Sequence, residues 1–353
     1  MISNEVLFFS LFIVFVIGVL MLDLGVFNKK THVIGFKEAA VWSGVWVMFT
    51  LIFYLVIDTH GDWIHGVDNF QELVHLKQKY ADHVKLYPGN FELSLQSYRD
   101  NMSLEFITGY LVEYALSVDN IFVIILIFSS FGVREQYYKK ILFWGILGAI
   151  VMRFTFIFTG SALMQRFHWI IYIFGAFLIF TGSKLFFQKD KDEKIDPNKH
   201  PIVRFVSKYF ALYPRYVKDR FFVRKEGKRL LTPLFLVLII IELTDLIFAV
   251  DSVPAVFSIT KDPFIVFFSN ICAILGLRSM FFFLSNIMHL FHYLKVGLSF
   301  LLIFIGLKMV SHNWLKKIGF ETSHSLYVII SILAISIIAS LIFPKKNKIE
   351  KSA

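Results

Sequence analysis

Long apolar segments recur along this chain of 353 residues, and they constrain its fold more than any other feature. A run of about 17–25 predominantly apolar residues is long enough to cross a bilayer as a helix. The sequence therefore predicts an all-α, polytopic membrane helix bundle of about nine transmembrane helices. The predicted spans cover residues 5–27, 39–57, 105–130, 138–160, 168–187, 233–258, 263–288, 293–311 and 325–343.

The composition of the chain supports a membrane location. Hydrophobic residues make up 57% of the chain and the mean hydropathy is +0.66, whereas a soluble domain carries about 45–50% apolar residues. The net charge of +10 lies mainly in loops beside the spans, so we expect no nucleic-acid partner. The single cysteine, Cys272, excludes an intramolecular disulfide and a cysteine-based metal cage.

The charges in the loops predict the orientation of the chain. Residues 188–232 carry 13 Lys and Arg against 6 Asp and Glu, whereas residues 58–104 carry seven acids against four Lys and Arg. Cytoplasmic loops are enriched in Lys and Arg. Nine spans with the N-terminus outside and the C-terminus in the cytoplasm put every basic loop inside.

The spans divide the chain into six predicted segments. These are two N-terminal transmembrane helices (1–57), an extracytoplasmic insertion (58–104), a first three-helix repeat (105–187), a basic cytoplasmic loop (188–232), a second, inverted three-helix repeat (233–311), and a C-terminal transmembrane helix with a basic tail (312–353).

Two of these segments resemble each other. Because each unit has three spans, the second enters the membrane from the opposite side, which predicts an inverted repeat with a pseudo-two-fold axis in the membrane plane. Proteins of this kind often bind substrate at the midplane between the repeats. The matched residues are Glu113 with Asp245, Asp119 with Asp251, Asn120 with Ser252, Arg153 with Arg278, and Lys184 with Lys308.

Five carboxylates lie inside the spans of the two units. A charged side chain near the membrane centre costs roughly 2.5–3.5 kcal/mol, and the two arginines within these spans cannot neutralise five acids. Carboxylate, amide and hydroxyl oxygens suit Mg²⁺, Ca²⁺ or Mn²⁺ and disfavour Cu⁺ or Zn²⁺. The predicted metal site comprises Glu113, Asp119, Asn120, Glu242, Asp245, Asp251 and Ser252, with Arg153 and Arg278 as charge partners.

Helical spacing predicts which of these side chains share a face. Glu242, Asp245 and Ser252 fall on one face of their helix, with Asp251 about a third of a turn away. Pro254 deprives the preceding turn of an N–H, which would free a carbonyl as a further ligand. The basic residues have structural interpretations as well: Arg153 and Arg278 as ion-paired struts, and Lys184 and Lys308 as snorkelling side chains near span ends.

The acidic motifs are those of a known family. They read Glu113-Tyr-Ala-Leu-Ser-Val-Asp-Asn-Ile-Phe122 and Phe248-Ala-Val-Asp-Ser-Val-Pro-Ala255, and a third motif is Leu275-Gly-Leu-Arg278. Over almost its whole length the chain resembles the TerC/Alx family of integral membrane proteins. The resemblance implies metal-ion homeostasis, most often manganese efflux, in a bacterial inner membrane, with the acidic residues as the ion site. The family is also associated with tellurite resistance and, in plastid relatives, with membrane-protein assembly. The insertion at 58–104 is longer than the family leads us to expect.

The leading hypothesis is a secondary transporter that exports Mn²⁺, with Ca²⁺ and Mg²⁺ as alternatives, and exchanges it for protons on the same acids. It has no permanently bound cofactor; its partners are the bilayer and the cation, and a homo-oligomer is possible. A membrane-protein assembly or stress-response factor without transport is the second hypothesis. An intramembrane aspartyl protease is the third, but its Tyr-Asp and Gly-x-Gly-Asp motifs are missing, so we expect no enzyme.

Overall fold

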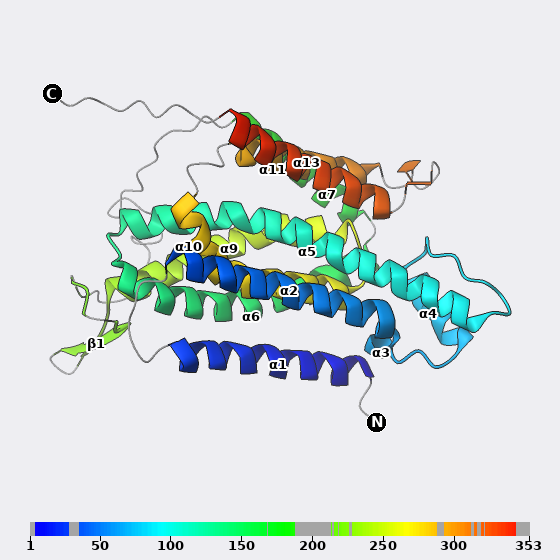
Figure 1. Ribbon diagram of the computed structural model, residues 1–353, viewed down its shortest axis with the longest axis horizontal. Helices are drawn as coiled ribbons and strands as arrows, with labels where there is room; N and C mark the ends of the chain where they lie inside the picture. Colours follow the sequence, from blue (N-terminus) through cyan, green and yellow to red (C-terminus); the bar gives the residue numbers. More distant parts are fainter. Residues whose placement is uncertain are drawn as a thin grey trace.

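The protein is built almost entirely from helices (Figure 1). The computed structural model describes residues 4–27, 35–167, 169–187, 213, 215–217, 219–225, 228–287, 293–311, 314–315, 319–320 and 322–343. Within these ranges, the side chains of 22–27, 119, 228 and 286–287 lie outside the description. Most of the predicted loop 188–232 and the basic tail therefore lie outside the described residues.

Eight of the described helices are long and apolar enough to cross a membrane. The remaining predicted span, 293–311, corresponds to α11 (Leu294–Val310), whose 17 residues match the lower limit for a spanning helix. Helices suit lipid because they satisfy their own backbone N–H and C=O groups. The prediction of a polytopic helix bundle is confirmed. The eight are α1 (Asn4–Phe27), α2 (Phe36–His60), α5 (Phe91–Ser130), α6 (Tyr138–Arg166), α7 (Ile170–Phe187), α9 (Pro233–Phe257), α10 (Pro263–Ile287) and α13 (Thr322–Ile342).

The predicted insertion is continuous with the bundle. It contains α3 (Asp62–His65), α4 (Phe70–Tyr80) and the first turns of α5. With 40 residues, α5 is about 60 Å long, twice the thickness of the hydrocarbon core. It begins well before residue 105 because the Asn90 side chain caps it, accepting the Leu93 N–H at 3.0 Å.

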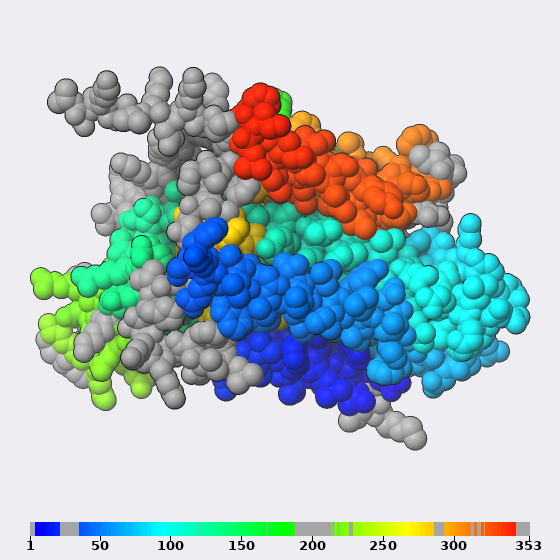
Figure 2. Space-filling view, viewed as in Figure 1, coloured from blue at the N-terminus to red at the C-terminus, as the bar shows by residue number. Residues whose placement is uncertain are grey.

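The helices surround α10. Within its apolar segment 89% of the residues are buried, compared with 17% for α1, α2 and α7. In Figure 1, α7, α11 and α13 form a layer at the top, and α1 lies at the lower edge. The hairpin of β1 (Phe222–Lys225) and β2 (Lys228–Leu231) lies at the opposite end of the molecule from α3 and α4. The space-filling view shows α13, α2 and the N-terminal half of α5 on one face (Figure 2).

Phenylalanines join α1 to this centre. The ring centroid of Phe9 lies 5.0 Å from that of Phe267, and that of Phe12 lies 4.6 Å from that of Phe268, both on α10. Tilted aromatic pairs at these separations add to the stability gained from apolar contact. Part of the high phenylalanine content therefore holds α1 against the bundle.

Glycines bring α7 and α11 into close contact. A Cβ added to Gly306 would lie 2.6 Å from the Gly175 carbonyl oxygen, and one added to Gly182 would lie 2.8 Å from the Ser299 carbonyl oxygen. The two contacts are reciprocal, since Gly182 and Gly306 differ by the same 124 residue numbers as Gly175 and Ser299. A two-fold axis between the helices would produce this reciprocity. The full inverted repeat stays a prediction.

Pro254 lies inside α9, which continues to Phe257. The helix therefore runs past the proline for one further turn, and the freeing of a carbonyl in the preceding turn stays a prediction. Proline near the end of a helix is tolerated because few backbone hydrogen bonds follow it. On α9 the acidic residues keep the relative directions of a regular helix.

Candidate functional site

A buried arginine lies at the centre of the bundle. Arg153 on α6 has 0% exposure, and its Nη1 donates hydrogen bonds to the Glu113 carboxylate on α5 and to Oδ1 of Asn270 on α10. On α9, Asp245 Oδ1 lies 3.4 Å from Nη2, and Ser252 Oγ lies 3.5 Å from Nη1. We call these five residues the Arg153 cluster. Four helices are thus joined through one guanidinium.

The Arg153 cluster follows from the helical spacing and from charge. Asp245 and Ser252 lie on the same face of α9, as predicted, and both reach Arg153. A charge buried in a low-dielectric interior is tolerated when it is paired and hydrogen-bonded. The strut interpretation of Arg153 is therefore supported, because the side chain pairs with two carboxylates.

Several buried polar atoms in this region have no hydrogen-bond partner among the described residues. They include Oε2 of Glu113, Oδ2 of Asp245, Nε of Arg153, Nδ2 of Asn120 and Oγ of Ser117. Such groups normally find a partner, and leaving one unpaired costs about 1–3 kcal/mol. Unpaired oxygens on two carboxylates leave capacity for water or a cation.

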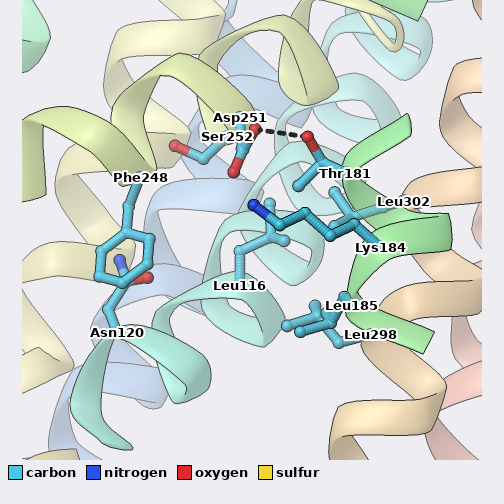
Figure 3. A pocket seen from close by; sticks show the side chains of 10 residues that line it. All are labelled: Leu116, Asn120, Thr181, Lys184, Leu185, Phe248, Asp251, Ser252, Leu298 and Leu302. Carbon is cyan, nitrogen blue, oxygen red and sulfur yellow. Dashed lines mark hydrogen bonds between the residues drawn. The ribbon is translucent and has the colours of Figure 1, made fainter. Parts of the chain in front are cut away.

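A cavity of about 180 Å³ adjoins the Arg153 cluster. Its polar lining consists of Asn120 on α5, Thr181 and Lys184 on α7, and Asp251 and Ser252 on α9, while leucines and Phe248 supply the apolar walls (Figure 3). Thr181 Oγ1 lies 3.4 Å from Asp251 Oδ1. Ser252 belongs to both the cavity and the cluster, so the two sites are contiguous.

The other predicted site residues are placed differently. Glu242 is half-buried, and its carboxylate occupies the space where Gly148 of α6 would otherwise carry a Cβ. Asp119 lies on α5, but its side chain is outside the described residues, so the predicted meeting of Asp119 and Asp251 stays a prediction. Arg278 is half-buried on α10, outside the contacts described above.

Among the described side chains, no three His, Cys, Asp or Glu are grouped closely enough to hold a metal ion. The described acids among the predicted ligands, which are Glu113, Glu242, Asp245 and Asp251, are therefore not gathered into one such group. Glu113 and Asp245 face Arg153, Asp251 faces the cavity, and Glu242 faces α6. The physical reason is the arginine, which attracts the two carboxylates that a cation would otherwise bind.

Sequence reasoning did not assign Asn270, a buried asparagine that accepts from Arg153. An amide within an apolar span was the available signal. It also missed Glu105, which has 2% exposure and lies on α5, with one carboxylate oxygen 3.7 Å from Nε2 of His83. Lys308 on α11 is half-buried, and the snorkelling interpretation of this residue stays a prediction.

A second charged group lies at the end of the molecule formed by the insertion. Nδ1 of His65 lies 2.9 Å from Glu5 Oε1, and Nε2 lies 2.7 Å from Asp262 Oδ2. Burial by itself would lower the pKa of His65, but the carboxylates of Asp262 and Glu5 outweigh it and raise that pKa to about 9. The imidazolium thus joins α1 and α3 to the residue preceding α10.

This group predicts a loss of stability at alkaline pH. The folded-state pKa of His65 lies above its ordinary value of 6.5, so the stabilisation is complete below pH 6.5 and is lost as pH rises through about 9. The full effect is on the order of 3 kcal/mol. Thermal unfolding of the purified protein between pH 6 and 10 measures it. In a His65→Gln variant the decrease in melting temperature across this range should be smaller, and an identical decrease would contradict the assignment.

The fold and these residues define a polytopic integral membrane protein whose helices enclose an ion-paired cluster and a polar cavity. The profile of the family described as "Integral membrane protein TerC family" matches residues 98–348. The chain belongs to this family.

Relatives extend the similarity to most of the chain. The chain is 44% identical to "Uncharacterized membrane protein STKORF319" of Myxococcus xanthus, over 94% of this chain and 91% of the relative. It is 41% identical to "Putative membrane-bound redox modulator Alx" of Escherichia coli strain K12, over 80% of this chain and 78% of the relative. No solved structure matches the chain.

Proposed function

We propose that this protein is a membrane transporter that exports divalent cations, with Mn²⁺ the leading candidate, through the cavity beside Asp251. One observation carries the proposal: a polar cavity containing a carboxylate adjoins unpaired carboxylate oxygens within helices long enough to span a membrane. Intramembrane acids are costly and usually mark ion or proton pathways. The proposal includes no enzymatic reaction.

The charge balance supports a cationic substrate. Arg153 supplies one positive charge to two carboxylates, Glu113 and Asp245, so the Arg153 cluster is one positive charge short when both acids are ionised. Asp251 adds a further acid on the adjoining cavity. A cation entering the cavity would reduce this excess. The same carboxylates can accept protons when the cation leaves, which supports cation/proton exchange.

The ligand atoms support a hard cation. The polar groups of the cavity offer carboxylate, amide and hydroxyl oxygens from Asp251, Asn120, Ser252 and Thr181. Oxygen ligands of this kind suit Mg²⁺, Ca²⁺ and Mn²⁺. The choice of Mn²⁺ among them comes from the family resemblance.

We place the protein in a bacterial inner membrane with the N-terminus outside and the C-terminus in the cytoplasm. Two features support this orientation. The hairpin β1–β2 carries Arg224, Lys225 and Arg229, whereas the acid-rich insertion lies at the other end of the molecule (Figure 1). Positive loops favour the cytoplasmic side.

Flux measurements in proteoliposomes test the proposal. Purified protein should transport Mn²⁺ in a saturable manner, with Ca²⁺ and Mg²⁺ compared under the same conditions, and a pH gradient should change the rate if protons are exchanged.

The alternative is an assembly or stress-response factor, and one relative is named a redox modulator. The single thiol, Cys272, is buried. We therefore propose that any redox role of this protein acts through the transport of metal ions and not through thiol chemistry. Absence of flux for all three ions, together with co-purifying membrane clients, would favour the alternative.

A further inference from the structure

The cavity lies between two groups of helices. Leu116 and Asn120 of α5 and Phe248, Asp251 and Ser252 of α9 form one side. The other side comes from α7 and α11, which pack against each other through their glycines. Because α7 carries both Thr181 and Lys184, a basic side chain reaches the cavity from the group of helices opposite Asp251.

The side chain of Lys184 runs into the cavity. Figure 3 shows its stem leaving α7 and its ammonium directed toward the end of the cavity where Asp251 and Ser252 lie. Thr181 and Lys184 are three residues apart, so they share one face of α7. A snorkelling lysine would instead extend toward the membrane surface. The position of the ammonium therefore calls for a role inside the cavity.

We infer that Lys184 acts as an internal cation that occupies the cavity when no substrate is bound and withdraws when a divalent cation enters. This inference rests on the proposed transport function and adds a determinant of its selectivity. A positive charge near Asp251 lowers the cost of a carboxylate in an apolar-walled cavity, and Lys184 is the basic residue among those that line the cavity. Lys184 also keeps exposed surface, which leaves space for its side chain to move out.

A tethered cation discriminates between ions by charge. The flexible stem of Lys184 tethers its ammonium to α7, so the ammonium has a high effective concentration in the cavity that Asp251 also lines. A monovalent ion that displaces the ammonium replaces one positive charge by another, so it gains little electrostatic binding energy. A divalent ion brings an additional charge, and its attraction to the carboxylates is correspondingly larger. Lys184 thus excludes Na⁺ and K⁺ and weakens divalent binding enough to permit release.

A Lys184→Met variant tests this inference, with Lys184→Arg to retain the charge and Lys37→Met as the matched control. Lys37 is an exposed residue in the first turn of α2, and its replacement removes the same charge away from the cavity. Calorimetry with MnCl₂ should give about tenfold tighter binding for Lys184→Met. NaCl should then compete with Mn²⁺, and turnover in proteoliposomes should decrease. Wild type, Lys184→Arg and Lys37→Met should behave alike.

The outcomes separate this inference from the proposed function. If wild type binds and transports Mn²⁺ but Lys184→Met has unchanged affinity and no sensitivity to NaCl, the internal-cation role is wrong and transport stands. If wild type neither binds nor transports a divalent cation, both proposals fall. An equal gain in affinity for Lys37→Met would show a general charge effect and would also overturn the inference. Thermal unfolding checks that each variant is folded.

Discussion

Replacing Asp251 by Asn should reduce Mn²⁺ flux to the background of protein-free liposomes. Asp251 is the carboxylate that lines the cavity together with Asn120 and Ser252. Asparagine keeps the size of the side chain but removes the negative charge that offsets the dehydration of a divalent ion. The expected effect is therefore on binding and flux. Tracer uptake into proteoliposomes and calorimetry with MnCl₂ measure the two quantities.

The design of this experiment requires a second aspartate for comparison. Asp219 is exposed, and its carboxylate lies 3.1 Å from Nζ of Lys140, in the part of the chain near the β1–β2 hairpin. Asp219→Asn removes the same charge far from the cavity and should leave flux at the wild-type rate. Wild-type flux in the Asp251→Asn variant would refute the assignment of the cavity as the transport route.

The second large effect concerns stability. An Arg153→Met variant should be destabilised by roughly 3–5 kcal/mol, because removing one partner leaves buried charges without compensation. Glu113 is fully buried and Asp245 is largely so, which places the loss in the interior of the bundle. Thermal or chemical unfolding in detergent, followed by circular dichroism, measures it.

A double variant distinguishes loss of a charge partner from loss of packing. Adding Glu113→Gln to Arg153→Met removes the uncompensated carboxylate, so the double variant should regain a substantial part of the lost stability. Arg166→Met is the matched control, since Arg166 is exposed at the end of the same helix and its loss should change stability by less than about 1 kcal/mol. A double variant less stable than Arg153→Met alone would contradict the charge explanation.

The helical bundle could be predicted because each span carries its own signal. Apolar length decides membrane crossing locally, without reference to the rest of the chain. The predicted span 105–130 lies within α5, but the beginning of this helix at Phe91 could not be predicted because its first turns are polar: Asn90 caps the helix, and α4 contacts it. A hydropathy pattern has no information about a helix that leaves the apolar region and continues.

Most residues of the candidate site could be predicted from the sequence, but which of them lie together could be predicted only in part. Asp245 and Ser252 share a face by spacing alone, and both reach Arg153. Glu113 binds this arginine, whereas Glu242 packs against Gly148. Both contacts depend on which helices are neighbours. Asn270 and His65 were missed because their partners lie far away in the sequence.

By itself, then, the sequence determined the membrane-spanning character of the chain and the presence of more acids than basic partners in its spans. Tertiary structure decided which acids are neutralised and which face an open cavity. The reason is that hydrophobicity and helical periodicity act over neighbouring residues, whereas an ion pair forms between whichever side chains the packing of separate helices brings together. Asp251 faces the cavity because α7 and α11 lie beside α9, and no local pattern in the sequence contains that contact.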